Sequence, residues 1–178
     1  MTTDARFWMR TGAVLGGLGV ILGALAAHGL EGRLLELYGG KVKMLMGTEI
    51  PAPQKYLADF KTAAEYQMYH ALAILAVGLL PGTASQKSAN VAGWCFLLGT
   101  ILFSGSLYVL VLTGQTKLGM ITPIGGVLFV VGWIALFKCV LNTTRVVSRQ
   151  SSEESNSLGV YSNQNSPRPP PKTNTESN

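Results

Sequence analysis

The stretch VAGWCFLLGTILFSGSLYVLVLTG, residues 91–114, contains no charged side chain and decides the fold class of this chain. An α-helix advances by about 1.5 Å per residue, so about 20 apolar residues cross the ~30 Å hydrocarbon layer of a membrane. The core of a soluble domain of this size does not need so long an uncharged run. The stretch therefore predicts a transmembrane helix.

The rest of the chain has the same character. Two further uncharged runs occupy residues 12–27 and 118–137. The 178 residues are 48% hydrophobic and 13% charged, whereas soluble domains contain about 25% charged residues. Another apolar segment begins after Pro53 as an amphipathic helix. We therefore predict an all-α membrane protein with four transmembrane helices in a compact antiparallel bundle, at residues 8–30, 54–80, 91–113 and 122–141.

Outside these helices the sequence predicts a loop and a tail. Residues 1–141 form the predicted four-helix transmembrane domain, and its longest connection, residues 31–53, contains the turn signals YGGK and PAP. From residue 142 the chain is rich in Ser, Asn, Thr, Gln and Pro. Such a composition buries too little surface to offset the entropy of ordering, so we predict a disordered polar tail at residues 142–178.

The first helix carries glycines spaced three and four residues apart, which places them on one stripe. They are Gly12, Gly16, Gly19 and Gly23. Together with Gly125 and Gly126 they are predicted to let membrane helices pack closely. Arg6, Arg10 and the sequence ALA at residues 24–26 are also features of a cleaved signal peptide. The length of the segment and its glycine stripe favour a retained helix.

Polar side chains in the predicted spans gather toward one side of the membrane, since antiparallel neighbours begin and end together. EYQMYH, residues 65–70, opens the second span where the first and third spans end. Ionisable groups inside a membrane avoid lipid and mark candidate functional sites. We therefore predict a polar cluster in the outer half of the bundle, formed by His28, Glu65, Tyr66, Gln67, Tyr69, His70, Ser104, Ser106, Tyr108 and Thr122.

The residues of this predicted cluster also have structural explanations. The two tyrosines near its centre suit an aromatic belt at the membrane surface, and His28 before Gly29 suits a helix C-terminus. Thr122 before Pro123 suits a helix N-cap, and the two serines can bond to their own helix. The cluster is therefore either a structural hydrogen-bond network or a site for a solute, a lipid headgroup or a cofactor.

Signatures of enzymes are missing from the sequence, which has no P-loop, nucleophile elbow or zinc-ligand spacing. We expect a protein without enzyme activity, metal or cofactor. Cys95 and Cys139 lie in different apolar runs and form no disulfide framework. The net charge of +5 is spread over ends and loops, which gives no indication of a nucleic-acid partner. Axial haem binding by the two histidines is a weaker alternative.

Four spans place both termini on the same side of the membrane. That side carries Arg6, Arg10, Lys87, Lys138, Arg145 and Arg149, and the other side carries Arg33, Lys41, Lys43, Lys55, Lys61 and Lys117. The counts are equal, but the first group crowds against the spans while the second is diluted through a long loop. We therefore expect a multi-pass protein of the cell's inner (plasma) membrane with cytoplasmic termini.

Four motifs in order resemble a known family of small membrane proteins. They are GALAAHGL (residues 23–30), FKTAAEYQMYHALA (60–73), LFSGSLYVLVLTG (102–114) and LGMITPIGGVLFVVGW (118–133). The family is catalogued as domain of unknown function 423, and transmembrane protein 256 of animals is similar. The resemblance implies an uncleaved first helix and a compact four-helix inner-membrane protein, and it implies no activity. The stretch from Tyr38 to Lys55 resembles an insertion into the family pattern, and the tail after Arg145 resembles an extension.

These observations predict a non-enzymatic interaction or assembly protein. Its expected partners are the lipid bilayer and either a second copy of the chain or another membrane protein. The alternative is a small transporter or a solute- or lipid-binding subunit that uses the polar cluster.

Overall fold

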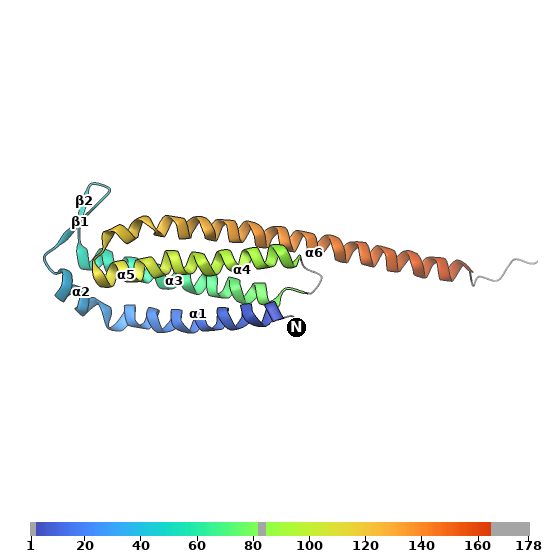
Figure 1. Cartoon of the computed structure of the whole chain (residues 1–178), viewed down its shortest axis with the longest axis horizontal. Helices are drawn as coiled ribbons and strands as arrows, with labels where there is room; N and C mark the ends of the chain where they lie inside the picture. The colour runs from blue at the N-terminus through green and yellow to red at the C-terminus, as the bar shows by residue number, and fades with distance from the viewer. Residues whose placement is uncertain (1–2, 82–84, 165–178) are drawn as a thin grey trace, which may run out of the picture.

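The computed structural model describes residues 3–81 and 85–164, and this part of the chain is almost entirely helical. The elements in chain order are α1 (Thr3–His28), α2 (Leu30–Tyr38), β1 (Val42–Leu45), β2 (Thr48–Pro51), α3 (Ala52–Leu79), α4 (Gln86–Thr100), the π-helical turn η1 (Ile101–Gly105), α5 (Ser106–Thr113), the 3-10 turn η2 (Thr116–Met120) and α6 (Thr122–Gln164). The long helices lie side by side along one axis, and α6 projects far beyond the others (Figure 1).

Three helical segments of the described chain are long and apolar enough to cross a membrane. They are Asp4–His28, Gln86–Thr113 and Thr116–Glu154. Helix α3 has the length of a span, but it carries polar and charged side chains among its apolar ones and is not one of the three. The mostly helical membrane fold agrees with the sequence prediction at this level.

Helices α1 and α3 form a closely packed antiparallel pair. A Cβ atom built on Gly12 would lie 2.8 Å from the carbonyl oxygen of Ala71, and one on Gly78 would lie 2.6 Å from Cγ of Met9. Only hydrogen at these positions lets the two backbones approach so closely. The pairing also sets the relative height of the helices, because Gly12 meets Leu75 while Gly19 meets Met68.

The second antiparallel pair joins α6 to the column of α4, η1 and α5. Here phenylalanine rings lie over glycines, with Phe129 against Gly99 and Phe96 against Gly132. At Gly125 the contact is with backbone, since an added Cβ would lie 2.5 Å from the amide nitrogen of Phe103. Helix α3 contacts α1, α2, α4 and α5, so it is the most enclosed helix of the bundle.

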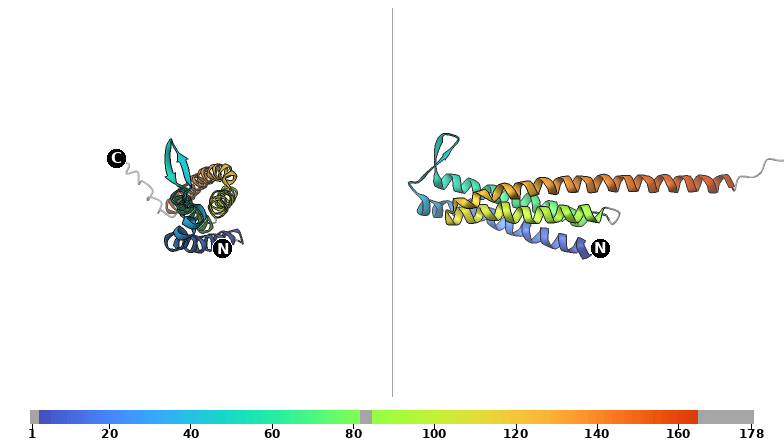
Figure 2. Two further views of the ribbon diagram at one scale, coloured as in Figure 1. Left: turned by 90° about the vertical axis from the view of Figure 1, so that its left-hand side faces the viewer. Right: turned by 45° about the horizontal axis from the view of Figure 1, so that its top comes forward.

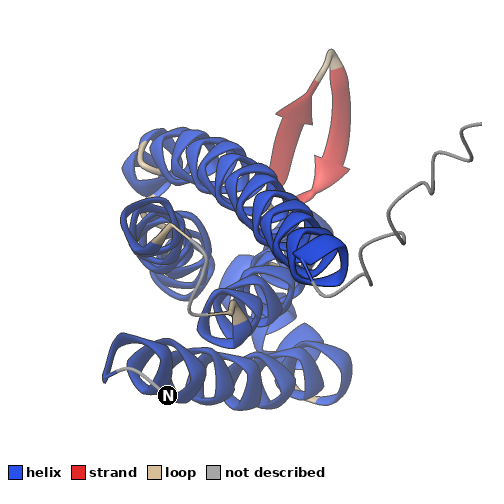
Figure 3. Ribbon diagram, turned by 90° about the vertical axis from the view of Figure 1, so that its right-hand side faces the viewer, coloured by secondary structure: helices blue, strands red, loops and turns tan. Residues whose placement is uncertain are grey.

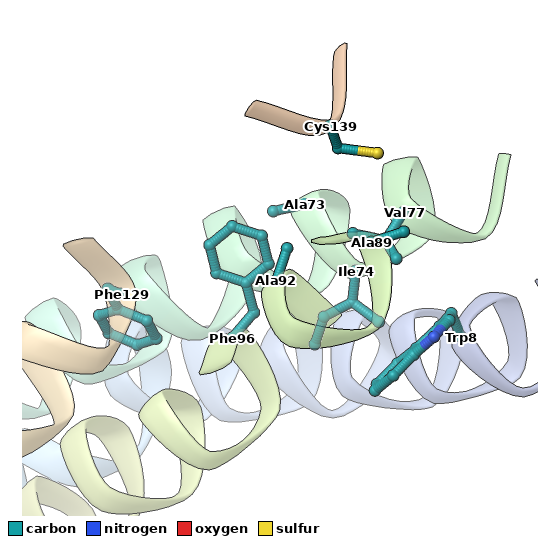
Figure 4. Close-up of a cluster of buried hydrophobic side chains, with 9 residues drawn as sticks. All are labelled: Trp8, Ala73, Ile74, Val77, Ala89, Ala92, Phe96, Phe129 and Cys139. Atoms are coloured by element: carbon teal, nitrogen blue, oxygen red, sulfur yellow. The ribbon is translucent and has the colours of Figure 1, made fainter. Parts of the chain in front are cut away.

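Buried apolar side chains form two clusters, one toward each end of the bundle. The cluster nearer the chain termini contains Trp8, Ile74, Val77 and Phe96, with Cys139 at its edge (Figure 4). The cluster at the other end contains Leu34, Tyr38, Tyr56, Phe60 and Val111. Each cluster draws on several helices, so the packing joins the two helix pairs at both ends.

The loop expected at residues 31–53 is a short helix followed by a β-hairpin. Helix α2 forms because Leu30, Leu34 and Tyr38 recur at four-residue spacing and are buried together. Strands β1 and β2 pair through a two-residue turn in which Met46 and Gly47 have φ of 49° and 86°, as the tight turns of hairpins require. The hairpin stands away from the helices (Figures 2 and 3).

The disordered tail was expected to begin at residue 142, but in the structure α6 continues to Gln164. Proline and glycine are absent from residues 133–158, so the sequence offers nothing to end the helix. Hydroxyl groups also bond within the helix, as Thr143 Oγ1 does to the carbonyl oxygen of Cys139 at 2.9 Å. The remainder of the expected tail, residues 165–178, lies outside the described residues.

Candidate functional site

His70 is the centre of the polar cluster. Its side chain is 4% exposed on α3. Its Nε2 lies 3.3 Å from the indole nitrogen of Trp133, and its Nδ1 lies 2.8 Å from the carbonyl oxygen of Tyr66. An indole N–H can only donate, so Nε2 accepts and Nδ1 carries the proton that it donates to Tyr66. Both ring nitrogens of the neutral imidazole are thereby used within the protein.

Aromatic rings surround this histidine. The Phe129 ring is stacked on the imidazole, with centroids 3.4 Å apart and planes 6° apart. The ring of Phe96 lies 5.5 Å from it, and that of Trp133 lies 6.2 Å from it at a steep angle. These rings enclose the imidazole, in agreement with its low exposure.

Gln67 links three helices. Its amide nitrogen donates to the carbonyl oxygen of Leu15 on α1 at 2.8 Å, and its amide oxygen accepts from the hydroxyl of Tyr108 on α5 at 3.0 Å. The side chain is 4% exposed. Between membrane helices such a hydrogen bond stabilises by about 0.6 kcal/mol on average and by up to about 1.7 kcal/mol, a modest gain because the polar groups also find partners when the helices are separated.

The serines of the cluster lie near the junction of η1 and α5. Ser106 Oγ donates to the carbonyl oxygen of Phe103 at 3.0 Å and lies 2.8 Å from Thr122 Oγ1, which ties α5 to the start of α6. Ser104 Oγ is fully buried and has no hydrogen-bond partner in the described part of the chain. It belongs to the π-helical turn η1, a backbone form that often accompanies functional sites.

Three predicted members on α3 have exposed side chains, which form none of these hydrogen bonds. Glu65 is exposed, and Tyr66 and Tyr69 are 39% and 56% exposed on the outer side of α3. The Tyr66 ring still covers the cluster, because it stacks on Phe103 with centroids 4.8 Å apart. The inward-facing residues at the heart of the site are therefore Gln67 and His70.

His28 is not near His70, contrary to the expectation that both histidines lie at one level. Gly19 is level with Met68, and Ala26 shares a core cluster with Phe60, so His28 is level with Asp59. Eleven residues separate that level from His70, or roughly 17 Å along the helix axis. The expectation failed because α3 begins at Ala52 and reaches the level of His28 at Asp59, well before His70.

This separation bears on the haem alternative. Axial ligation by two histidines requires both imidazoles at the same iron atom, and His28 and His70 do not meet. Within the described residues, no group of three His, Cys, Asp or Glu side chains could hold a metal ion. The two cysteines are free thiols, Cys139 being buried and Cys95 half-buried.

The predicted packing glycines separate into two kinds. Gly12 and Gly125 face other helices so closely that a Cβ would lie under 3 Å from a neighbouring atom, whereas Gly16, Gly19, Gly23 and Gly126 have neighbours at ordinary contact distance or none within 4 Å. Sequence reasoning missed four close contacts, at Gly78, Gly93, Gly99 and Gly132. Each of these glycines lies against a side chain or the backbone of another helix. The spacing of residues within one helix does not reveal such a contact.

Comparisons with known proteins agree with this membrane architecture. Residues 22–126 match the model of a family described as protein of unknown function (DUF423). The chain is 42% identical over 132 residues to a UPF0382 membrane protein of Staphylococcus epidermidis, which covers 72% of this chain and 93% of that protein. It is 41% identical over 126 residues to the UPF0382 membrane protein YwdK of Bacillus subtilis, and the match covers 70% of this chain and 88% of that protein. No solved structure matches the chain significantly.

Proposed function

Because the chain belongs to the DUF423 family of small membrane proteins, we propose that it crosses the membrane four times and works by binding other membrane components. It is not an enzyme in this proposal. The observation that carries it is the hydrogen-bond network of Gln67 and His70, which is satisfied by other helices of the same chain.

The fourth span in this proposal is α3. Its 28 residues have a length of about 42 Å, more than a ~30 Å hydrocarbon layer requires. It runs antiparallel to α1 and leads directly toward α4, and both of these neighbours belong to candidate spans. Its charged side chains all lie in the half that follows the hairpin, residues 52–65, and the buried polar side chains of the other half, Gln67 and His70, are hydrogen-bonded to neighbouring helices.

The proposed location is the plasma membrane, with both termini in the cytoplasm. The basic residues at the terminal end of the bundle lie close to the spans, which is the pattern of cytoplasmic ends. The hairpin then lies on the outer side, with Met46 fully exposed at its tip. A membrane-impermeant thiol reagent should label Met46→Cys on intact cells and label Ser152→Cys only after permeabilisation, with the unlabelled parent chain as control.

The polar network serves in this proposal to orient the helices. The bonds of Gln67 to Tyr108 and of His70 to Trp133 join helices that are not paired through glycine contacts, and the rings of Phe96 and Phe129 pack beside the imidazole. A buried network of this kind specifies one arrangement among several apolar packings of similar energy. Reaction chemistry would need an accessible reactive group, and His70 is enclosed.

The outer face of α1 is the proposed partner-binding surface. Small side chains recur there at spacings of four and three residues, and all are exposed: Ala13, Gly17, Val20, Ala24 and Ala27. Small residues in this pattern let membrane helices associate through close backbone contact. The proposed partner is a second copy of the chain or another membrane protein.

Photo-crosslinking in native membranes tests this surface. A photoreactive amino acid at Val20 should give a discrete protein adduct, whereas the same amino acid at Val130, equally exposed on α6, should give only lipid adducts. Gly17→Leu should abolish the Val20 adduct. Equal protein adducts from both positions, or none from Val20, would contradict the proposal.

A second candidate function is binding of a small solute by the cluster, and Ser104 is the observation that favours it. A buried hydroxyl without a partner is unusual and fits a group awaiting a ligand. In that case Ser104→Ala and His70→Ala should lower solute transport or solute-induced thermal stabilisation. If both variants change only the stability of the protein and leave its crosslinked partner unchanged, the cluster is architectural.

A further inference from the structure

A groove between α1 and α4 opens near the terminal end of the bundle. It is lined by Arg6, Phe7, Arg10, Thr11, Val14 and Leu15 of α1 and by Leu97 of α4, and has a volume of about 710 Å³. This is within the range of roughly 300–1,000 Å³ that is usual for sites of small molecules. The lining is polar at one end of the groove and apolar along the remainder.

The polar end consists of two arginines one helical turn apart. Arg6 and Arg10 are both exposed, and in the described part of the chain neither forms an ion pair with a carboxylate. Two like charges four residues apart on a helix repel each other. An anion bound between the two guanidinium groups would remove this repulsion and accept hydrogen bonds from both.

The apolar end matches a hydrocarbon chain. Val14 is 62% exposed within the groove, beside the half-buried Leu15 and Leu97. These side chains follow the arginines along α1, so the groove runs from its charged end along the helix toward the middle of the bundle. A ligand that fits both ends carries a negative headgroup and an acyl chain.

We propose that this groove binds an anionic phospholipid, with the phosphate between Arg6 and Arg10 and an acyl chain along Val14, Leu15 and Leu97. This site goes beyond the protein–protein interaction proposed above and begins nearer the start of α1, before Ala13 of that surface, with a lining that also includes Leu97 of α4. Charge complementarity selects an anionic lipid over a zwitterionic one.

An aromatic group beside the arginines marks the depth of the headgroup. Phe7 lies 4.8 Å from Trp8 and 5.9 Å from Trp94 between ring centroids, and Trp94 is 50% exposed. Tryptophans of this kind sit at the headgroup level of a bilayer. The guanidinium groups are therefore at the height at which lipid phosphates occur.

Native mass spectrometry of the detergent-purified full chain tests the proposal, with phosphatidylglycerol and phosphatidylcholine as probes. The parent chain should retain one phosphatidylglycerol at a concentration roughly 10- to 30-fold lower than it needs for phosphatidylcholine, since each arginine near a headgroup contributes about fivefold. The double variant Arg6→Gln/Arg10→Gln should lose this selectivity. Val14→Phe should weaken retention of both lipids, because it fills the groove and keeps both charges.

The matched control is Lys87→Gln/Lys138→Gln, which removes the same charge at the same end of the bundle on another face. This variant should keep the selectivity of the parent chain. Equal loss in both double variants would mean diffuse charge attraction and would overturn the site. Displacement of the lipid by millimolar glycerol phosphate would likewise overturn it, because it would show that the acyl chain does not bind.

Discussion

The two helix pairs of this protein reach close contact by different means. In the α1–α3 pair, Gly12 and Gly78 bring one backbone against the other. In the α4–α6 pair, the rings of Phe96 and Phe129 are the nearest neighbours of Gly132 and Gly99, and Gly125 is the glycine whose nearest neighbour is a backbone atom. Lipid is as apolar as leucine and gives no hydrophobic drive between helices. Close packing must then supply the attraction, and either arrangement provides it.

Between the pairs, hydrogen bonds of side chains add to the apolar contacts. His70 binds Trp133 of α6, and Gln67 binds Tyr108 of α5. Each bond is directional and has one partner, so it selects the rotation of one pair against the other. The glycine contacts therefore hold each pair together, and the polar bonds orient the pairs.

The largest loss of stability should follow when a glycine that touches backbone gains a methyl group. Gly12→Ala and Gly125→Ala are each expected to destabilise by about 3 kcal/mol, because a backbone atom cannot move aside without shifting its helix. Reversible unfolding in mixed detergent micelles, followed by circular dichroism, measures this. Gly23→Ala is the control and should be neutral, since nothing lies within 4 Å of its added Cβ.

A smaller loss is expected where the neighbour is an aromatic ring. Gly99→Ala and Gly132→Ala should each destabilise by about 1–2 kcal/mol, because the rings of Phe129 and Phe96 can rotate or slide. The same unfolding experiment compares these variants with Gly12→Ala. A loss equal to that of Gly12→Ala would show that the two pairs do not differ in kind.

Removing one hydrogen bond between the helix pairs should lower the stability less than either kind of glycine substitution. Gln67→Leu keeps the side-chain volume and is expected to destabilise by about 1 kcal/mol, since the Tyr108 hydroxyl loses its acceptor. Spin-label distances between α1 and α6 should broaden at the same time. Unchanged distances would mean that apolar packing alone orients the pairs.

The smallest effect is expected at Ser104. Its hydroxyl is buried without a partner, so Ser104→Ala should be neutral or stabilise by up to about 1 kcal/mol. Melting temperatures of the two proteins in the same detergent measure this. A clear destabilisation would indicate a bound partner for the hydroxyl and would favour solute binding by the cluster.

The sequence predicted the positions of the individual helices in the chain better than their relative heights in the bundle. The apolar runs at residues 91–113 and 122–141 gave the helical segments that begin near Gln86 and at Thr122. The predicted end of the last helix, at residue 141, was wrong. The polar composition from residue 142 suggested disorder, but this stretch contains no proline or glycine before residue 159 that would end the helix. His28 was misplaced because residues 65–70 were aligned with the end of the first helix, whereas α3 reaches the level of His28 already at Asp59.

For the site, the sequence predicted which polar residues take part but not which partners they bind. His70, Gln67 and Tyr108 stand out as polar side chains in apolar surroundings, and the structure joins Gln67 to Tyr108. The partners that use their polar atoms, Trp133 and the carbonyl oxygen of Leu15, carried no signal in the sequence. A hydrogen bond across helices depends on rotation and height, and neither follows from a single helix.

By itself the sequence determined that this protein is helical and belongs in a membrane, because long uncharged runs leave no other way to satisfy the backbone. It also gave the positions of the glycines along each helix, any of which could allow close contact. Only the tertiary structure decided which of them do, and that His70 lies at mid-bundle, far from His28. The physical reason is that hydropathy acts along one helix, whereas the height and rotation of neighbours follow from side chains fitting between helices.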